Sequence, residues 1–506
     1  MNKINSEETN QYRTTNNWVS IQDIQEHFQS HNNYDLLVRK VYIKSLKADG
    51  YIAYLNGTVD VKVVDESIVR PLQQENSLEN VDDSDQLDFL AKRIIPVSNV
   101  GINSRLENAL EKIVSGYTLL FVEDTPFYLE ISTPGFESRG VEKSEDEAVL
   151  KGPKEAFSES MDINLSLVRK LIKSSELIAE YSKVGEMAVN EVGILYMTNI
   201  VNPDLLDKVR NRINEIDTDE VLNLALLEQH IEERPYSLIP TVLYTERPDR
   251  AAAFLKEGHV ILIMNNSPSC LIVPVTFWGL FHTPEDAYSR WFYGNFIRII
   301  RLIAIFVTIL TPSLYIATTN YHIEMLPTDL VLAISATRER VPFPAIFEVV
   351  MLLGAFELIR ESGVRVPSPI GPTIGIVGAL ILGQAAVEAN LISPILVIVV
   401  AVTGLASFAI PNLSFSYMIR LSTYLFLIFA SFWGFYGIAA CIVMSIGYLT
   451  SVTSYDVPFL SPLAPFYPSS KDLIVRPPIW KQWLRPFNVH PQNKQRKKKP
   501  EGVQNQ

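Results

Sequence analysis

The first 285 residues alternate short apolar runs with amphipathic segments, whereas long uninterrupted apolar runs begin only after Arg298. Apolar runs of about 4 to 8 residues bounded by turn residues are typical of strands, and apolar residues three and four apart are typical of helices. Residues 202–216, NPDLLDKVRNRINEI, show this helical spacing with charges between the apolar positions. The pattern predicts an α/β region followed by a helical region.

Two stretches of the α/β region match each other at one offset of 142 residues. Residues 51–60 align with 193–202, and residues 105–131 align with 247–273. An unchanged offset across two separated blocks argues against chance and indicates an internal repeat. We therefore predict two related α/β subdomains, at 36–150 and 171–285, joined by a linker at 151–170. The polar residues 1–35 are expected to be disordered.

The helical region has a composition typical of membrane proteins. The runs at 302–319, 373–387, 391–410 and 421–449 carry no charged residue, and no lysine occurs between Lys256 and Lys471. Because a helix needs about 20 apolar residues to cross the hydrocarbon core, we predict an all-α, multi-span membrane domain at 286–455 with about 4–6 helical segments. The run 421–449 fits either one tilted span or a tight hairpin.

The charge distribution predicts the orientation. The net charge is -12 in total, with -17 in residues 1–257, -2 in 258–470 and +7 in 471–506. Arginines 290, 298 and 301 precede the first apolar run, and basic residues near the ends of spans stay on the cytosolic side. We expect a multi-pass protein whose N-terminal region and basic tail, 456–506, are cytosolic, with the tail at an anionic leaflet or serving only as a solubilising stop-transfer segment. The polar N-terminus predicts no signal peptide.

Ionisable residues interrupt the apolar segment 342–361. Glu348 and Glu357 lie nine residues apart, which places them on opposite sides of a helix. Ionisable groups at membrane depth face water, a partner or a conduction path. The two glutamates therefore either contribute to such a path or pair with Arg338, Arg340 or Arg360 in an interfacial helix, and Arg338 and Arg340 are candidates for gating or pairing.

The segment 369–390, PIGPTIGIVGALILGQAAVEAN, is rich in small residues. Small residues let helices approach closely, so the segment is either a well-packed interior helix or, in a ring of several chains, the lining of a narrow path. The candidate pore-lining residues are Thr373, Val377, Gln384 and Glu388.

The sequence contains no pattern that indicates an enzyme. GxxxxGK[ST], GxGxxG and HExxH are absent, and His230, His259 and His282 occur singly. The two cysteines, at positions 270 and 441, cannot form a disulfide framework or a zinc site. We predict no catalytic residue, no metal, no cofactor and no nucleic-acid partner.

Five segments resemble the A subunits of spore germinant receptors, the GerA family. They are KGPKEAFSESMDINLSLVRK at 151–170, ERPDR at 246–250, SPSCLIVPVTF at 267–277, RERVPFP at 338–344 and IGIVGALILGQAAVEANLISP at 374–394. A sporulation-stage V paralogue shares this architecture, so the resemblance identifies the family rather than the member.

The resemblance implies a protein of the inner spore membrane that works with B and C subunits and contacts the lipids of that membrane. It also implies a homo-oligomer that forms a nutrient-gated ion channel and releases ions to trigger germination. The alternative is a non-conducting scaffold or signal transducer that assembles the receptor. A secondary transporter is disfavoured, because the internal repeat lies in the soluble half and not among the spans.

Overall fold

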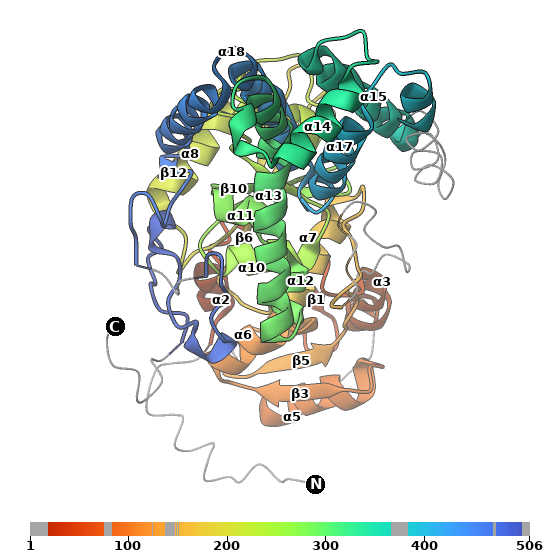
Figure 1. The fold of residues 1–506 in the computed structure, drawn as a ribbon. Coiled ribbons are helices and arrows are strands. Elements are labelled where there is room, and N and C mark those ends of the chain that lie inside the picture. Colours follow the sequence, from red (N-terminus) through yellow and green to blue (C-terminus); the bar gives the residue numbers. More distant parts are fainter. Residues whose placement is uncertain are drawn as a thin grey trace.

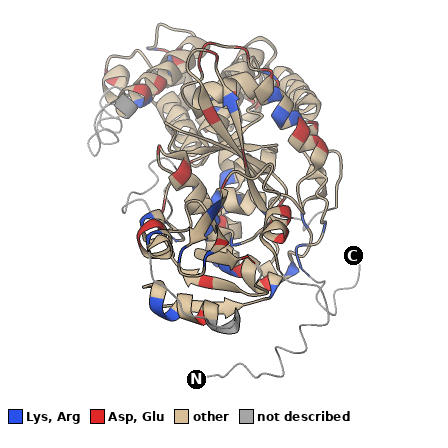
Figure 2. Ribbon diagram, turned by 180° about the vertical axis from the view of Figure 1, so that it is seen from behind, with Lys and Arg blue, Asp and Glu red and all other residues tan. Residues whose placement is uncertain are grey.

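The computed structural model describes residues 19–74, 83–123, 125–136, 147, 149, 151–365, 383–468 and 472–497. Two five-stranded sheets form the N-terminal half, and a layer of helices follows them in the sequence. In Figure 1 the first sheet and the helical layer lie at opposite ends of the molecule, with the second sheet between them. Charged residues are spread over the α/β region, while long stretches of the helices are uncharged (Figure 2).

The first sheet is antiparallel throughout, with the strand order β1-β2-β4-β5-β3. Its strands are β1 (Leu36–Ile43), β2 (Ala48–Leu55), β3 (Val100–Asn103), β4 (Tyr117–Val122) and β5 (Tyr128–Ser132). Successive side chains of a strand point to opposite faces, and both faces are apolar here. Ala53 and Leu55 pack against helices α2 (Ile21–His27) and α6 (Leu106–Val114), whereas Ile52 packs against the helices between residues 61 and 94.

The second sheet has the equivalent order β6-β7-β9-β10-β8 and is also antiparallel. Its strands are β6 (Leu177–Val184), β7 (Asn190–Met197), β8 (Leu243–Thr245), β9 (Val260–Met264) and β10 (Cys270–Val273). One face is covered by α7 (Met161–Leu171) and α10 (Pro248–Leu255), and the other by α8 (Pro203–Asn214) and α9 (Leu224–Ile231).

The pairing registers of the two sheets agree at the offset found in the sequence. Ile52 pairs with Leu120 in the first sheet, and Ile194 pairs with Leu262 in the second. A shift of one residue would turn every side chain of a strand to the opposite face, so register is a sensitive test of equivalence. The two halves of the α/β region therefore share strand order and central register.

Two segments differ from their predicted character. The segment 151–170, predicted as a linker, contains most of α7, whose residues Leu165 and Val168 belong to the core under the second sheet. Within the segment 1–35, predicted as disordered, the described residues include helix α2, because Ile24 buries its side chain against α6 and a Ser20–Asp23 capping box begins the helix.

The helical layer contains, among the described residues, helical residues at 383–388 and five further α-helices. The five helices are α13 (Trp291–Asn320), α14 (Thr328–Arg338), α15 (Ala345–Arg365), α17 (Pro394–Ser407) and α18 (Leu413–Ser451). Helix α13 begins 11 residues before the predicted apolar run at 302, because Arg298 and Arg301 in its first turns bond to Asp286 of the α/β region. Ile305 and Phe415 share one hydrophobic core with Phe281, so the second sheet domain and the helical layer are continuous.

Helix α18 is sharply bent at Gly434, which has φ 57° and ψ -131°. A Cβ atom at Gly437 would lie 2.0 Å from the carbonyl oxygen of Phe429, eight residues earlier. In a straight helix, residues eight apart are separated by about 12 Å, so the chain folds back at this point. Of the two arrangements predicted for 421–449, the structure contains the hairpin.

The segment predicted as a basic cytosolic tail is folded onto the second sheet domain over its described part. Residues 472–497, here called the C-terminal strap, contact this domain through Val489, which lies in the core with α8 and α9. Arg485 donates from Nε to the carbonyl oxygen of Lys256 at 2.8 Å, and the backbone N–H of Gln492 donates to Ile200 at 2.9 Å. Hydrogen bonds to the backbone and the burial of Val489 therefore attach the strap to the second sheet domain.

Candidate functional site

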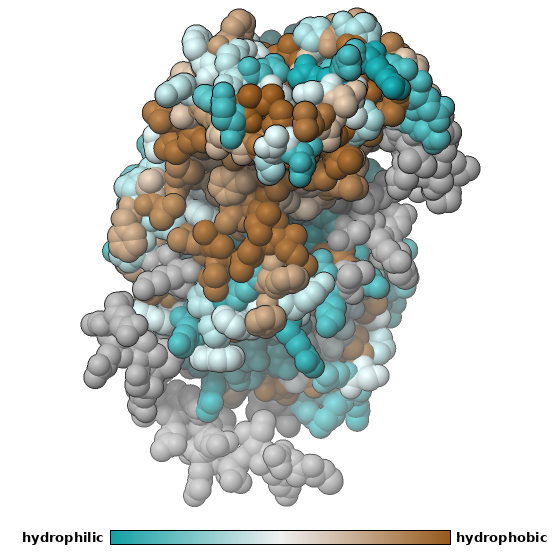
Figure 3. Space-filling view, viewed as in Figure 1, coloured by the Kyte–Doolittle hydropathy of each residue, from teal (hydrophilic) through white to brown (hydrophobic). Residues whose placement is uncertain are grey.

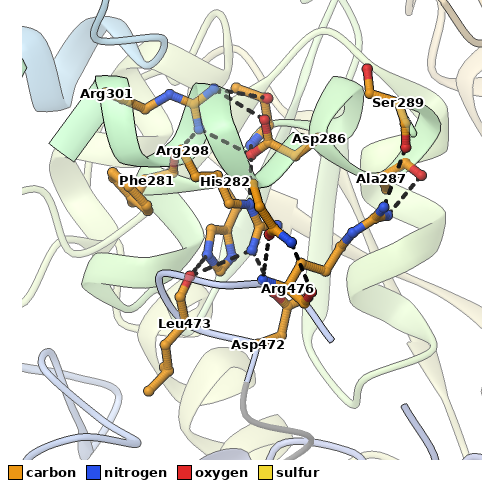
Figure 4. Close-up of polar contacts among 12 residues, drawn as sticks. Phe281, His282, Asp286, Ala287, Ser289, Arg298, Arg301, Asp472, Leu473 and Arg476 are labelled. Atoms are coloured by element: carbon orange, nitrogen blue, oxygen red, sulfur yellow. Dashed lines mark hydrogen bonds and ion pairs between the residues drawn. The ribbon is translucent and has the colours of Figure 1, made fainter. Parts of the chain in front are cut away.

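A buried polar junction joins the second sheet domain, the first turns of α13 and the C-terminal strap. Two short helices lead into it, α11 (Phe277–Phe281) and α12 (Pro284–Tyr288). Thr283 and Asp286 form a capping box at the start of α12, which fixes the Asp286 side chain at the helix N-terminus. Figure 4 shows the side chains of α12, α13 and the strap converging there.

Asp286 accepts hydrogen bonds from two arginines of α13. Arg298 donates from Nε at 3.1 Å, and Arg301 donates from both terminal nitrogens at 3.0 and 3.2 Å. Burial alone would raise the pKa of Asp286, but the hydrogen bonds and charge of Arg301, with the charge of Arg298, outweigh it and lower this pKa below its ordinary value. The carboxylate therefore stays ionised and binds α13 to α12.

The same arginines reach other partners around the junction. Arg301 donates to the carbonyl oxygen of Phe281 at 2.7 Å, and its guanidinium lies 5.5 Å from the centre of the Phe281 ring. Arg298 forms an ion pair with Asp472 of the strap. Arg298 therefore joins the second sheet domain, α13 and the strap.

His282 holds the strap from the domain side. Its Nε2 lies 2.6 Å from the carbonyl oxygen of Leu473, which can only accept, so this nitrogen carries the hydrogen. Burial, and then the positive charge of Arg298, lower the pKa of His282 to about 4. The imidazole is therefore neutral at pH 7.

Arg476 fixes the strap against the start of α13. Its guanidinium donates to the carbonyl oxygens of Ala287 at 2.8 Å and Ser289 at 3.3 Å. Its own carbonyl oxygen accepts from the indole of Trp291 at 2.6 Å, and its backbone N–H donates to Asn295 at 2.7 Å. These bonds make the position of the strap depend on the position of α13.

A cavity of about 260 Å³ lies beside the junction, between α10, α12 and the strap. Four of its charged groups are paired with one another, since Glu257 pairs with Arg496 and Asp472 pairs with Arg298. Among the residues that the structure describes, no group of three or more His, Cys, Asp or Glu side chains is placed to hold a metal ion. These two ion pairs attach the strap to the second sheet domain and to α13.

Those candidate residues predicted from the sequence that the structure describes lie in the helical layer, away from this junction. Thr373 and Val377 fall outside the described residues. Gln384 and Glu388 are exposed, and the Gln384 amide donates to the Glu388 carboxylate at 3.0 Å. Arg338 donates to the side-chain oxygen of Asn320 at 3.4 Å. Arg340 is exposed.

The two glutamates of α15 have different partners. Glu348 is 1% exposed and accepts the backbone N–H of Ser393, the residue that caps α17, at 3.0 Å. A carboxylate is favoured at this position by the unpaired N–H groups of a helix start. Glu357 forms ion pairs with Arg360, one of its three predicted partners, and with Arg420. The ion pair of Glu357 with Arg420 of α18 was not predicted, because it depends on how α15 and α18 pack against each other.

The junction itself was not predicted either. The sequence marks Arg298 and Arg301 only as basic residues before an apolar run, and it marks His282 only as an isolated histidine. A signal was available in the spacing, because two arginines three residues apart on one helix face require a buried acidic partner if that face is covered. Their partners Asp286 and Asp472 lie 12 and 174 residues away from Arg298.

Comparison with known proteins places the chain in a family. Residues 22–488 match the family model of the Bacillus/Clostridium GerA spore germination protein. The chain is 36% identical over 449 residues to spore germination protein KA of Bacillus subtilis (strain 168), covering 88% of this chain and 82% of that protein. It is 34% identical to the uncharacterized membrane protein YfkQ of the same organism, covering 86% and 85%.

A solved structure also matches the N-terminal half. It is the crystal structure of the N-terminal domain of the A subunit of the Bacillus megaterium spore germinant receptor GerK3. The match has 28% sequence identity and a TM-score of 0.41, and it covers 51% of this chain and 94% of that one.

Proposed function

The chain belongs to the GerA family of spore germination proteins, and from this premise we propose that it is the A subunit of a germinant receptor. In this role it oligomerises in the inner spore membrane and forms a nutrient-gated ion channel, whose opening releases ions and triggers germination. It works there with B and C subunits of the receptor.

The membrane part of this proposal is supported by two helices. Among the described residues, α13 and α18 are long and apolar enough to cross a membrane. Only 44% and 39% of their most apolar stretches are buried, whereas a core helix of a soluble protein is mostly buried. Figure 3 shows a continuous hydrophobic band over α13 and the helices above it.

The observation that carries the proposal is the continuity of α13. This helix runs for 30 residues from the ion pairs of Asp286 into the helical layer, where Tyr315 and Ile316 pack against α15 and α17. A rigid helix anchored at both ends transmits a displacement along its axis. The junction would therefore connect the state of the α/β region to the state of the helical layer.

The conducting path is proposed in the small-residue segment, with Thr373, Val377, Gln384 and Glu388 as its lining. Small residues allow close approach of helices around an axis, and polar groups offer contacts for a passing ion. Glu348 and Glu357 support the packing of the surrounding helices through α17 and α18.

Reconstitution tests this proposal against a non-conducting scaffold. The purified full-length chain is placed in liposomes loaded with potassium, and ion efflux is compared with that from empty liposomes. A channel subunit releases potassium above the background, and the Val377→Ala substitution, which shortens an apolar side chain in the proposed lining, increases the efflux. A chain that releases none, alone and with both partner subunits added, is a scaffold.

A further inference from the structure

A loop of the second sheet domain lies beside the end of helix α18. It is the connection between α9 and β8, residues 232–242, and is called the α9–β8 loop here. Arg234 donates from Nη2 to the carbonyl oxygen of Ser451 at 2.9 Å, and the hydroxyl oxygens of Ser237 and Tyr448 lie 2.8 Å apart. Both partners belong to the last turn of α18, so the loop is attached to this helix where the helix ends.

The last turn of α18 is also the place where the chain leaves the helical layer. Val452, the next residue, is buried in the core of the second sheet domain, and Phe415 near the start of α18 lies in the same core. Before this point α18 exposes large apolar side chains, among them Val443 and Ile446. With α18 in a membrane, its last turn therefore lies at the level of the lipid headgroups.

The α9–β8 loop is held in one shape by bonds within the domain. The backbone N–H of Thr241 donates to the Glu232 carboxylate at 3.1 Å, which closes the base of the loop. The backbone N–H of Ser237 donates to the carbonyl oxygen of Arg234 at 2.9 Å, and Ile239 is buried in the core of the domain. The tip between these points is therefore preorganised, so binding through it costs little conformational entropy.

The two large side chains at the tip are exposed. Tyr236 is fully exposed and Leu238 is 51% exposed, although each is next to a residue fixed by the contacts above. Since Ser237 between them touches Tyr448, the tip and the exposed end of α18 form one continuous surface. Exposing apolar area to water is unfavourable, so a rigid loop that presents such side chains has a surface suited to apolar surroundings.

The acidic side chains of the loop are bonded to the rest of the domain. Glu232 accepts from Thr241, as described above. Glu233 pairs with Arg212 and accepts the backbone N–H of Tyr455 at 3.0 Å. The charged residue closest in sequence to Tyr236 is therefore a basic one, Arg234. A lipid phosphate that approaches the tip meets a guanidinium group.

We propose that the α9–β8 loop docks onto the membrane surface, with Tyr236 and Leu238 inserted at the boundary between lipid headgroups and acyl chains. Tyrosine is favoured at this depth because its ring is apolar and its hydroxyl group is polar. Arg234 stays at the phosphate level, as basic side chains near the ends of spans do. The contact fixes the second sheet domain against the bilayer. This inference rests on the proposed membrane location of α18.

Nitroxide labels test the surroundings of the loop in the full-length protein, placed in nanodiscs of phosphatidylcholine and phosphatidylglycerol. Single labels are attached through Tyr236→Cys, through Val443→Cys on α18 and through Tyr42→Cys. Tyr42 is an exposed tyrosine of the first sheet, at the opposite end of the molecule from the helical layer (Figure 1). The two native cysteines are buried, and the unsubstituted chain measures how much label they take up.

Collisions with oxygen report contact with lipid, because oxygen concentrates in the bilayer, whereas a hydrophilic nickel chelate reports contact with water. The ratio of oxygen to nickel collisions at position 236 is expected to lie clearly above the ratio at position 42 and below that at position 443. Equal ratios at positions 236 and 42, with a high ratio at 443, overturn this inference and leave α18 in the membrane. A low ratio at position 443 as well contradicts the membrane location of α18 itself.

Two further results separate lipid from other partners. A label at position 236 that is protected from both reagents is covered by protein, such as a second copy of this chain, and this result overturns the proposal. Adding Leu238→Ser to the labelled Tyr236→Cys chain is expected to lower the ratio, because the tip loses its other inserted side chain. Leu37→Ser, at an exposed leucine of the first sheet, is the matched control and should leave the ratio unchanged. Equal ratios in these two variants contradict the insertion of Leu238.

Discussion

Asp35 and Arg169 lie 134 residues apart in the sequence and meet in a fully buried ion pair at the contact between the two sheet domains. The nearest nitrogen and oxygen atoms are 2.6 Å apart, and Arg169 also donates to the carbonyl oxygen of Leu177 at 2.7 Å. Beside this pair, the backbone N–H of Tyr34 donates to Ala179 on the edge strand β6. The two sheet domains are therefore joined by directional bonds and not only by a connecting chain.

The substitution Arg169→Met is expected to lower the free energy of unfolding by about 3 to 5 kcal/mol, because it leaves the Asp35 carboxylate buried without its partner. Urea unfolding of the solubilised protein, followed by circular dichroism, measures this loss. The adjacent substitution Lys170→Met is the control, since its ion pair with Glu155 is exposed and should contribute about 0–1 kcal/mol. Equal losses in the two variants would contradict the role assigned to the buried pair.

Replacing both partners separates the cost of an unpaired charge from the value of the pair. The double substitution Asp35→Leu with Arg169→Met removes both charges and is expected to recover much of the stability lost in Arg169→Met alone. The same urea titration provides the comparison. A double variant less stable than either single variant would show that the pair itself is strongly stabilising.

The substitution Asp286→Asn is expected to destabilise the contact between α12 and α13 by about 3 to 5 kcal/mol, because Arg298 and Arg301 lose the carboxylate that they share. Glu285→Gln, one residue earlier on the same helix, is the matched control and should have little effect. Limited proteolysis of the strap provides a local readout, since Arg298 also holds Asp472. Faster cleavage between residues 472 and 497 is expected in Asp286→Asn alone.

Stability should fall as the pH decreases from about 6.5 to about 4, because His282 stays neutral in the folded protein down to a pKa of about 4. The unfolded chain binds a proton near the ordinary value of 6.5, so protons favour unfolding in this window, and the effect is constant below it. At about 1.4 kcal/mol per pKa unit, the expected loss from this residue is about 3 kcal/mol.

Unfolding of His282→Gln at pH 7 and pH 4.5 tests this pH dependence. The variant should lose less stability between the two pH values than the wild-type protein does. His259 contributes a parallel loss in both proteins, since burial lowers its pKa to about 4 as well. A His282→Gln variant with the full wild-type dependence would refute the assignment.

The sequence predicts local patterns and the internal repeat better than it predicts tertiary contacts. The 142-residue offset recurs in the pairing of Ile52 with Leu120 and of Ile194 with Leu262, because alternating burial specifies register within each strand pair. The strap could not be predicted in this way. Arg476 donates to the backbone carbonyl oxygens of Ala287 and Ser289. Because every residue has a backbone carbonyl oxygen, the sequence does not show which residues accept these bonds.

The choice between a span and a hairpin at 421–449 was open for a related reason. Glycine occurs in straight membrane helices as well as at bends, so its presence does not mark a turn. The bend at Gly434 is fixed by contacts with the end of α13, where the Tyr321 hydroxyl donates to the carbonyl oxygen of Ser431. A long apolar run therefore indicates that a segment lies in apolar surroundings. It does not indicate whether the helix is straight or bent.

The substitution Gly434→Ala is expected to destabilise the helical hairpin by about 1–3 kcal/mol, because residues with a side chain rarely adopt its backbone angles. An added Cβ would also lie 2.9 Å from the Cβ of Tyr321. Gly447→Ala is the control, since its Cβ would meet nothing within 4 Å. Thermal unfolding in detergent should separate the two variants, with Gly447→Ala at or above the wild-type midpoint.

Spin labels on the two arms of α18 test the hairpin directly. With labels at the exposed positions Leu425 and Val443, a straight helix would separate the two backbones by about 27 Å, whereas the folded arms bring them closer. The wild-type protein should show the short distance, and Gly434→Ala should broaden the distribution toward the long one. A single long distance in the wild-type protein would mean that α18 is straight. Both ends of α18 could not then lie against the second sheet domain, as Phe415 and Val452 do.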